Sequence, residues 1–228
     1  MSTATTEQIR VPAPGGAEVV GDLVFPNQVP ASGLVLFAHG SGSSRFSPRN
    51  MYVADQLRGA GLATLLVDLL TLHEEAVDLQ TAHLRFDINL LADRLIATID
   101  WLKNHSSTRD LPIGLFGAST GAAAALAAAA HRPDGVAAVV SRGGRPDLTP
   151  EPDLANVRAP VLLIVGGNDD IVLGLNDLAL RRLQSPKQMR VVPGATHLFE
   201  EPGALEQVAV LARDWFSYSL SPAGRGTG

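Results

Sequence analysis

A serine stands between small residues and two glycines in the segment GASTG, residues 117–121. An apolar run precedes this segment, and a run of small residues long enough for a helix follows it. A chain that turns at once from strand to helix strains the residue at the bend, and bulky side chains two positions away would collide there. Such a bend would present the Ser119 hydroxyl as a nucleophile. A glycine-rich chain can match this pattern by chance. The prediction therefore depends on the location of the segment between a predicted strand and a predicted helix.

A serine hydroxyl needs a base to take its proton, and the chain has six histidines. His197 lies in VVPGATHLFE, after the last predicted strand, and it follows the serine in the chain order typical of such sites. His39 also ends a strand but precedes the serine, which favours a structural hydrogen-bonding role beneath a loop. The other four are expected at the surface or at helix ends, namely His73, His83, His105 and His131.

The base in turn needs a carboxylate that fixes its tautomer and stabilises the imidazolium. The segment GGNDDIV, residues 166–172, ends a strand and offers two aspartates. Asp169 is favoured because it is nearer the strand end, which leaves Asp170 to cap the following helix. Asp147, in the loop after the preceding strand, is the reserve candidate.

Backbone amides are expected to stabilise the negative charge that develops on a substrate oxygen. One candidate is the Thr120 amide at the start of a helix, and the second is the Ser41 amide in HGSG, residues 39–42. Gly40 and Gly42 would let this loop approach the substrate closely. This chemistry needs no cofactor, and no histidine and carboxylate spacing in the sequence indicates a metal site.

Two arginines stand at predicted strand ends that face the same cleft, Arg45 and Arg142. A guanidinium there could bind a carboxylate or phosphate on a small-molecule substrate. The two arginines could equally well form salt bridges with loop acids such as Asp147 or Glu151, so both interpretations stay open.

The elements that must position these residues alternate between apolar strands and helices, which predicts an α/β fold. Strands are expected at 33–38, 62–68, 111–117, 135–141, 159–166 and 189–194, and helices at 48–60, 84–104, 120–131, 172–183 and 203–217. Residues 16–26 would add an antiparallel edge strand. The expected architecture is a doubly wound, mostly parallel sheet of about seven to eight strands with helices on both faces.

A single domain is expected over residues 1–228, with about 1–15 and 219–228 flexible. Only residues 142–158 separate two late strands, which leaves no room for a large cap domain. A net charge of −5 with scattered cations argues against nucleic acid as a partner. The lack of cysteine, of a secretion signal and of a membrane-length apolar run favours a cytoplasmic protein. The composition suits a monomer or a homodimer.

The segments HGSG, GASTG, GGNDDIV and GATHLFEEPG, in this order, resemble the α/β-hydrolase superfamily and, more narrowly, its small dienelactone hydrolase-like branch. The resemblance extends from about residue 18 to 217. It implies a nucleophile at Ser119, an acid at Asp169, a base at His197 and hydrolysis through an acyl-enzyme. Dienelactone hydrolases proper use a cysteine where this chain has Ser119, so their substrate is not carried over.

These observations favour a serine hydrolase that cleaves a small-molecule carboxylic ester or lactone. The same triad could instead perform acyl transfer, perhydrolysis or C–C cleavage, since the fold does not choose what resolves the intermediate. A third alternative is a non-catalytic binding protein. Such proteins usually lack one triad member, whereas all three are present here.

Overall fold

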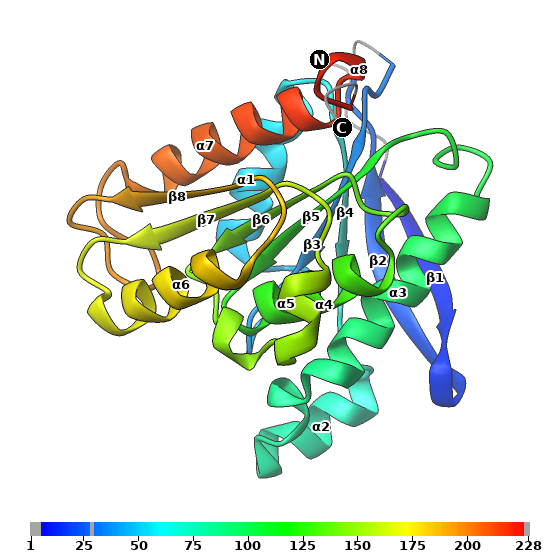
Figure 1. Cartoon of the computed structure of the whole chain (residues 1–228). Helices are drawn as coiled ribbons and strands as arrows, with labels where there is room; N and C mark the ends of the chain where they lie inside the picture. Colours follow the sequence, from blue (N-terminus) through cyan, green and yellow to red (C-terminus); the bar gives the residue numbers. More distant parts are fainter. Residues whose placement is uncertain (1–5, 28–29, 226–228) are drawn as a thin grey trace.

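The computed structural model describes residues 6–27 and 30–225, and in these residues eight strands form one sheet (Figure 1). The strands are β1 (Thr6–Ala13), β2 (Ala17–Val24), β3 (Leu34–Ala38), β4 (Ala63–Val67), β5 (Ile113–Ala118), β6 (Ala138–Arg142), β7 (Val161–Gly166) and β8 (Lys187–Val192). Their order across the sheet is β1-β2-β4-β3-β5-β6-β7-β8. The strands from β3 to β8 all pair in parallel, while β1 and β2 form an antiparallel hairpin at one edge.

Helices cover both faces of this sheet, which confirms the predicted α/β fold. The helices are α1 (Pro48–Gly59), α2 (Leu72–Thr81), α3 (Ile88–Asn104), α4 (Thr120–His131), α5 (Glu151–Asn156), α6 (Asp170–Arg182), α7 (Ala204–Ser219) and α8 (Pro222–Arg225). Buried residues of α1 and α7 share one apolar cluster with one face of the sheet. Those of α3, α4, α5 and α6 share the cluster on the other face. The central strands are apolar throughout because both of their faces are covered.

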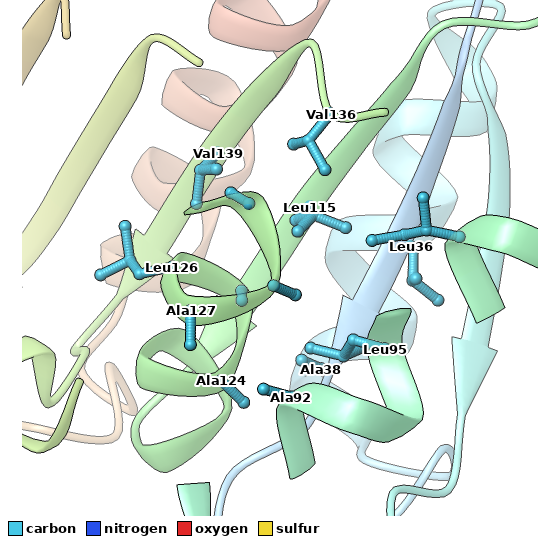
Figure 2. Close-up of a cluster of buried hydrophobic side chains, with 14 of the residues drawn as sticks. Leu36, Ala38, Ala92, Leu95, Leu115, Ala124, Leu126, Ala127, Val136 and Val139 are labelled. Carbon is cyan, nitrogen blue, oxygen red and sulfur yellow. The ribbon is translucent and has the colours of Figure 1, made fainter. Parts of the chain in front are cut away.

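The alanine run of α4 lets this helix lie close to the sheet and to α3 (Figure 2). Residues 122–129 are all at most 2% exposed. Ala124 and Ala127 point into the cluster that also holds Ala92 and Leu95 of α3 (Figure 2). Small side chains therefore bring the start of α4, which follows Ser119, close to the central strands.

The amino-terminal segment differs from the prediction. Residues 6–13 were expected to be flexible, yet they form β1 and pair with β2 from Thr6↔Val24 to Ala13↔Ala17. The edge of the sheet is therefore β1, and β2 is the second strand. Ile9 and Val11 are buried at alternate positions, a period of two that the polar residues around them obscure. Residues 1–5 lie outside the described part of the chain.

The carboxyl-terminal segment also departs from the prediction in part. Residues 219–228 were expected to be flexible, but Ser219 ends α7 and α8 follows at Pro222–Arg225. Residues 226–228 lie outside the described residues.

Helix α2 was not predicted, because residues 69–83 lie between the expected strand at 62–68 and the expected helix at 84–104 and were assigned to neither. It begins with a capping box in which Thr71 and Glu74 exchange side-chain to backbone hydrogen bonds. Its large apolar residues, such as Leu72 and Leu79, are exposed and give no stripe facing the core. The next helix, α3, accordingly starts at Ile88 with Asp87 as its N-cap rather than at residue 84.

Between β6 and β7 the chain forms only a 3-10 turn at Pro146–Leu148 and the short α5, so there is no large cap. In the described residues no helix combines the length and apolarity that crossing a bilayer requires.

Candidate active site

Ser119 occupies the predicted bend, alone between β5 and α4, with φ 51° and ψ −120°. This positive φ is strained for a serine and is held by tight packing on either side. A Cβ atom on Gly121 would lie 2.3 Å from the Ala38 carbonyl oxygen, and one on Gly117 would lie 2.4 Å from the Ala122 Cα. The backbone passes so close at both positions that only glycine fits.

His197 and Asp169 form a hydrogen-bonded pair at this edge of the sheet. His197 lies in the loop after β8, and its Nδ1 is 2.7 Å from Oδ2 of Asp169, which directly precedes α6. A carboxylate at this distance accepts the Nδ1 hydrogen and leaves Nε2 as the nitrogen for proton transfer. Asp170 is the first residue of α6, and Asp147 pairs with Arg145 instead.

Ser119 and His197 face one cavity of about 210 Å³. The residues that line it are Gly40, Ser41, Ser43, Ser47, Arg49, Asn50, Ala118, Ser119, Arg142, His197 and Leu198. The structure therefore brings together a serine and a histidine 78 positions apart in the sequence, at the edge where the parallel strands end.

His39 fixes the loop that carries one predicted oxyanion donor. Its Nε2 accepts a hydrogen bond from the Leu69 N–H at 3.1 Å, so its Nδ1 carries the hydrogen and donates to the Gly40 carbonyl at 2.9 Å. The Ser43 N–H also donates to that carbonyl, at 3.2 Å. Because N–H and C=O point in opposite directions across a trans peptide, this turns the Ser41 N–H away from His39.

The two predicted oxyanion donors are the N–H groups of Ser41 and Thr120. Thr120 begins α4, where a helical N–H has no partner within the helix. Within the described part of the chain neither N–H donates to a protein group. Gly40 approaches the serine, since a Cβ there would lie 3.1 Å from the Ser119 Cβ. The loop therefore lies against the bend, as a two-donor arrangement requires.

Burial lowers the pKa of His39 below its usual value of about 6.5. Below about pH 6.5, His39 therefore binds a proton more readily in the unfolded chain than in the folded chain. Stability is then lost as the pH falls below about 6.5, by at most about 1.4 kcal/mol per pH unit from this residue. We expect urea denaturation between pH 8 and pH 5.5 to show a shallower decline for His39→Gln than for the wild type. Equal slopes would contradict this role.

Arg142 brings a buried positive charge to the cavity. It is 6% exposed and its Nη2 donates to Oδ1 of Asn50 at 3.2 Å, while its buried Nε has no partner. Among the described residues it forms no ion pair with a carboxylate. Burial, together with the positive charge of Arg49, lowers the pKa of Arg142 to about 10. A cation held in this way favours an anion that enters the cavity from solvent.

Arg45 lies elsewhere. Its guanidinium pairs with Asp22 and Asp68, and its backbone N–H donates to Asp68 at 2.8 Å. It does not line the cavity that holds Ser119. These ion pairs hold the loop after β3 against β2 and the end of β4. Of the two interpretations that the sequence left open for Arg45, the structure therefore supports the salt bridge.

Gly42 has φ +68°, a conformation that favours glycine, and it lines a neighbouring cavity rather than the one with Ser119.

Arg49 and Asn50 were not predicted as site residues, but both line the cavity from the first turn of α1. Arg49 donates to Glu200 at 3.1 Å, which partly neutralises it. A cation in the first turn of a helix is unfavourable because it lies near the positive end of the helix dipole. The position of Arg49 at the start of the expected helix could therefore have indicated a functional role.

The parallel sheet, the strained serine after β5 and the His–Asp pair together define an α/β hydrolase. The model of the dienelactone hydrolase family matches residues 20–219, so the chain belongs to this family. The crystal structure of a dienelactone hydrolase from Anabaena variabilis ATCC 29413 is 56% identical, with a TM-score of 0.91, over 96% of this chain and 99% of that chain. Est1E from Butyrivibrio proteoclasticus shares the fold, with a TM-score of 0.75 at 16% identity over 92% and 97% of the two chains.

A curated relative from Mycobacterium tuberculosis (strain ATCC 25618 / H37Rv) bears the name "Putative phosphoribosyl transferase". It is 57% identical over 218 residues, which are 96% of this chain and 47% of the relative. The chain thus spans about half the length of this relative.

Proposed function

We propose that this hydrolase cleaves a carboxylic ester or lactone of a small molecule through an acyl-enzyme on Ser119. The observation that carries the proposal is the cavity shared by Ser119, in its strained bend, and His197, whose Nδ1 is held by Asp169. Among the described residues this is the place where a serine, a histidine and a partly buried carboxylate converge. Membership of a hydrolase family supports the same conclusion.

In the proposed first step, His197 Nε2 takes the proton of Ser119 Oγ as that oxygen attacks the carbonyl carbon. The carbonyl oxygen becomes an oxyanion and accepts hydrogen bonds from the N–H groups of Ser41 and Thr120. The tetrahedral intermediate collapses, and His197 gives its proton to the departing alcohol oxygen. The acyl group stays on Ser119.

The second step repeats this chemistry with water. His197 takes a proton from water as the water oxygen attacks the acyl carbon, then returns a proton to Ser119 Oγ, and the carboxylic acid leaves. Asp169 stabilises the imidazolium in both steps. A positioned base contributes roughly 10²- to 10⁴-fold and each oxyanion donor about 3–4 kcal/mol. These groups account for ester or lactone hydrolysis.

Acyl transfer, perhydrolysis and C–C cleavage would use the same triad, and no contact in the cavity favours one of them over hydrolysis. The transferase name belongs to proteins of about twice this length and is not carried over. A cytoplasmic location, the absence of a nucleic-acid partner and a monomeric or homodimeric state stay predictions.

A burst experiment tests the proposal. With p-nitrophenyl acetate we expect rapid release of about one p-nitrophenol per enzyme, followed by slower steady turnover as the acyl-enzyme is hydrolysed. A panel of esters and lactones of increasing acyl length then identifies the preferred bond. If no ester or lactone in the panel is turned over faster than by heat-denatured protein, the proposed function is wrong.

The unpaired charge of Arg142 leads us to propose that the natural substrate is an anion. We expect Arg142→Met to raise KM about 10-fold or more for an ester that carries a carboxylate or phosphate, and much less for its neutral methyl ester, because only the anion loses its counterion. Arg181→Met, an exposed arginine on α6, is the matched control and should change neither value. Equal effects of Arg142→Met on both esters would contradict the proposal that Arg142 binds an anionic group of the substrate.

A further inference from the structure

A second cavity, of about 70 Å³, adjoins the one that holds Ser119. It lies beneath α2, and its lining residues are His39, Gly40, Ser41, Gly42, Ser43, Ser44, Asp68, Leu69, Leu70, Glu75, Asp78, Leu79, Arg85, Leu91 and Thr120. The two cavities share Gly40, Ser41 and Ser43. Ser41 and Thr120, which carry the two proposed oxyanion donors, thus both border this second space.

The position of His197 decides which part of a substrate enters which cavity. In the tetrahedral intermediate the reacting carbon bears Ser119 Oγ, the oxyanion, the leaving-group oxygen and the acyl chain. His197 must reach the leaving-group oxygen to protonate it, and His197 lines the first cavity only. The alcohol portion therefore belongs in the first cavity, and the acyl chain must extend in the remaining direction, past the oxyanion donors.

We propose that the cavity beneath α2 is the acyl pocket of this enzyme and that Glu75 and Leu79 of α2 determine which acyl groups it accepts. The inference rests on the proposed function and adds to it the orientation and chemical class of the substrate.

Charge distinguishes the two cavities. The first holds Arg142 and Arg49, whereas the second is lined by three carboxylates. Asp78 is neutralised by Arg85, whereas Asp68 shares the guanidinium of Arg45 with Asp22, so these three groups together keep one negative charge. Glu75 is exposed at the edge of the pocket and forms no ion pair among the residues that the structure describes.

This asymmetry predicts a substrate whose anionic group lies on the alcohol side and whose acyl group is neutral or positively charged.

The size of the pocket limits the acyl chain. Leu69, Leu70 and Leu91 form apolar walls, and Leu79, 75% exposed, stands at the rim. A volume of about 70 Å³ corresponds to roughly two to three water molecules in the liquid, so it suits an acyl chain of about two to four carbons. The class of substrate is therefore a short-chain acyl ester, or the corresponding lactone, of an anionic alcohol.

Reversing the charge of Glu75 tests the electrostatic part of the proposal. In Glu75→Lys we expect kcat/KM, corrected for uncatalysed hydrolysis, to rise about 10-fold for monophenyl succinate, whose acyl group is anionic, and to fall about 10-fold for the phenyl ester of glycine, whose acyl group is cationic. Phenyl butyrate and phenyl acetate should stay within about 2-fold. Each substrate is compared with itself in the wild type, so differences in intrinsic reactivity cancel. Gln80→Lys places the same charge on α2 outside the pocket and should leave all four values unchanged.

Enlarging Leu79 tests the steric part. Leu79→Trp should lower kcat/KM for phenyl butyrate about 10-fold and leave phenyl acetate within about 2-fold, because the bulky ring narrows the pocket at its rim and an acetyl group is too short to reach it. Leu72→Trp, equally exposed on α2 but outside the pocket, is the matched control.

The outcomes separate this inference from the proposed function. If the wild type cleaves phenyl acetate while Glu75→Lys and Leu79→Trp leave every ratio at its wild-type value, the acyl pocket is wrong and the hydrolase assignment stands. If the wild type cleaves none of the phenyl esters, the proposed function fails and this inference fails with it.

Discussion

Ser119→Ala is expected to lower kcat about 10⁵- to 10⁶-fold for any ester that the wild type hydrolyses. The variant removes the oxygen that forms the acyl-enzyme, while the oxyanion donors and Arg142 remain in place. KM should therefore change far less than kcat, and the initial burst of p-nitrophenol should vanish. Steady-state and stopped-flow kinetics on p-nitrophenyl acetate measure both quantities.

Ser106→Ala, which alters an exposed serine in the loop before β5, is the control and should match the wild type. Residual turnover by Ser119→Ala above about 1% of the wild-type rate, after purification from contaminating esterases, would mean that another group attacks the substrate.

Gly121→Ala is expected to lower the free energy of unfolding by about 3 kcal/mol or more. The added methyl group would lie 2.3 Å and 2.4 Å from the carbonyl oxygens of Ala38 and His39. Both oxygens belong to the backbone at the end of β3, so relief requires the oxyanion loop to move away from Ser119. We therefore expect kcat/KM to fall together with stability, as measured by urea denaturation and by ester hydrolysis on the same preparation.

The same substitution in α6 provides a matched control. A Cβ on Gly174 would meet nothing within 4 Å, so Gly174→Ala should stabilise the protein by about 0.5–1 kcal/mol through helix propensity alone. If Gly121→Ala were as well tolerated as Gly174→Ala, the close approach of α4 to β3 would not constrain the bend.

Much of the fold could be predicted because the relevant signals are local. Strands buried on both faces are apolar throughout, and the bounds of α4 follow from the bend at Ser119 and from the small residues after it. The order of the motifs also predicted that Ser119, His197 and Asp169 lie at one edge of the sheet, because the carboxyl ends of parallel strands meet there.

The parts that could not be predicted depend on contacts between distant segments. Arg45 is drawn away from the cavity by Asp22 and Asp68, and nothing in the sequence near residue 45 indicates either partner. Conversely, the sequence does not show that Arg142 lacks a carboxylate partner in the described chain, because its neighbour at the end of β6 is Asn50, a residue 92 positions earlier in the chain. Helix α2 escaped prediction because its apolar residues face outward, so the helical periodicity does not appear as a buried stripe.

The proposed mechanism depends on activation of the Ser119 hydroxyl by His197. Incubation with a fluorophosphonate probe, followed by mass spectrometry of the digested protein, tests it directly because the probe reacts with activated serines. The account predicts one adduct, on Ser119, in the wild type, and its loss in His197→Ala although that variant keeps the serine. An unmodified Ser119, an adduct on a different serine, or labelling that survives in His197→Ala would contradict it.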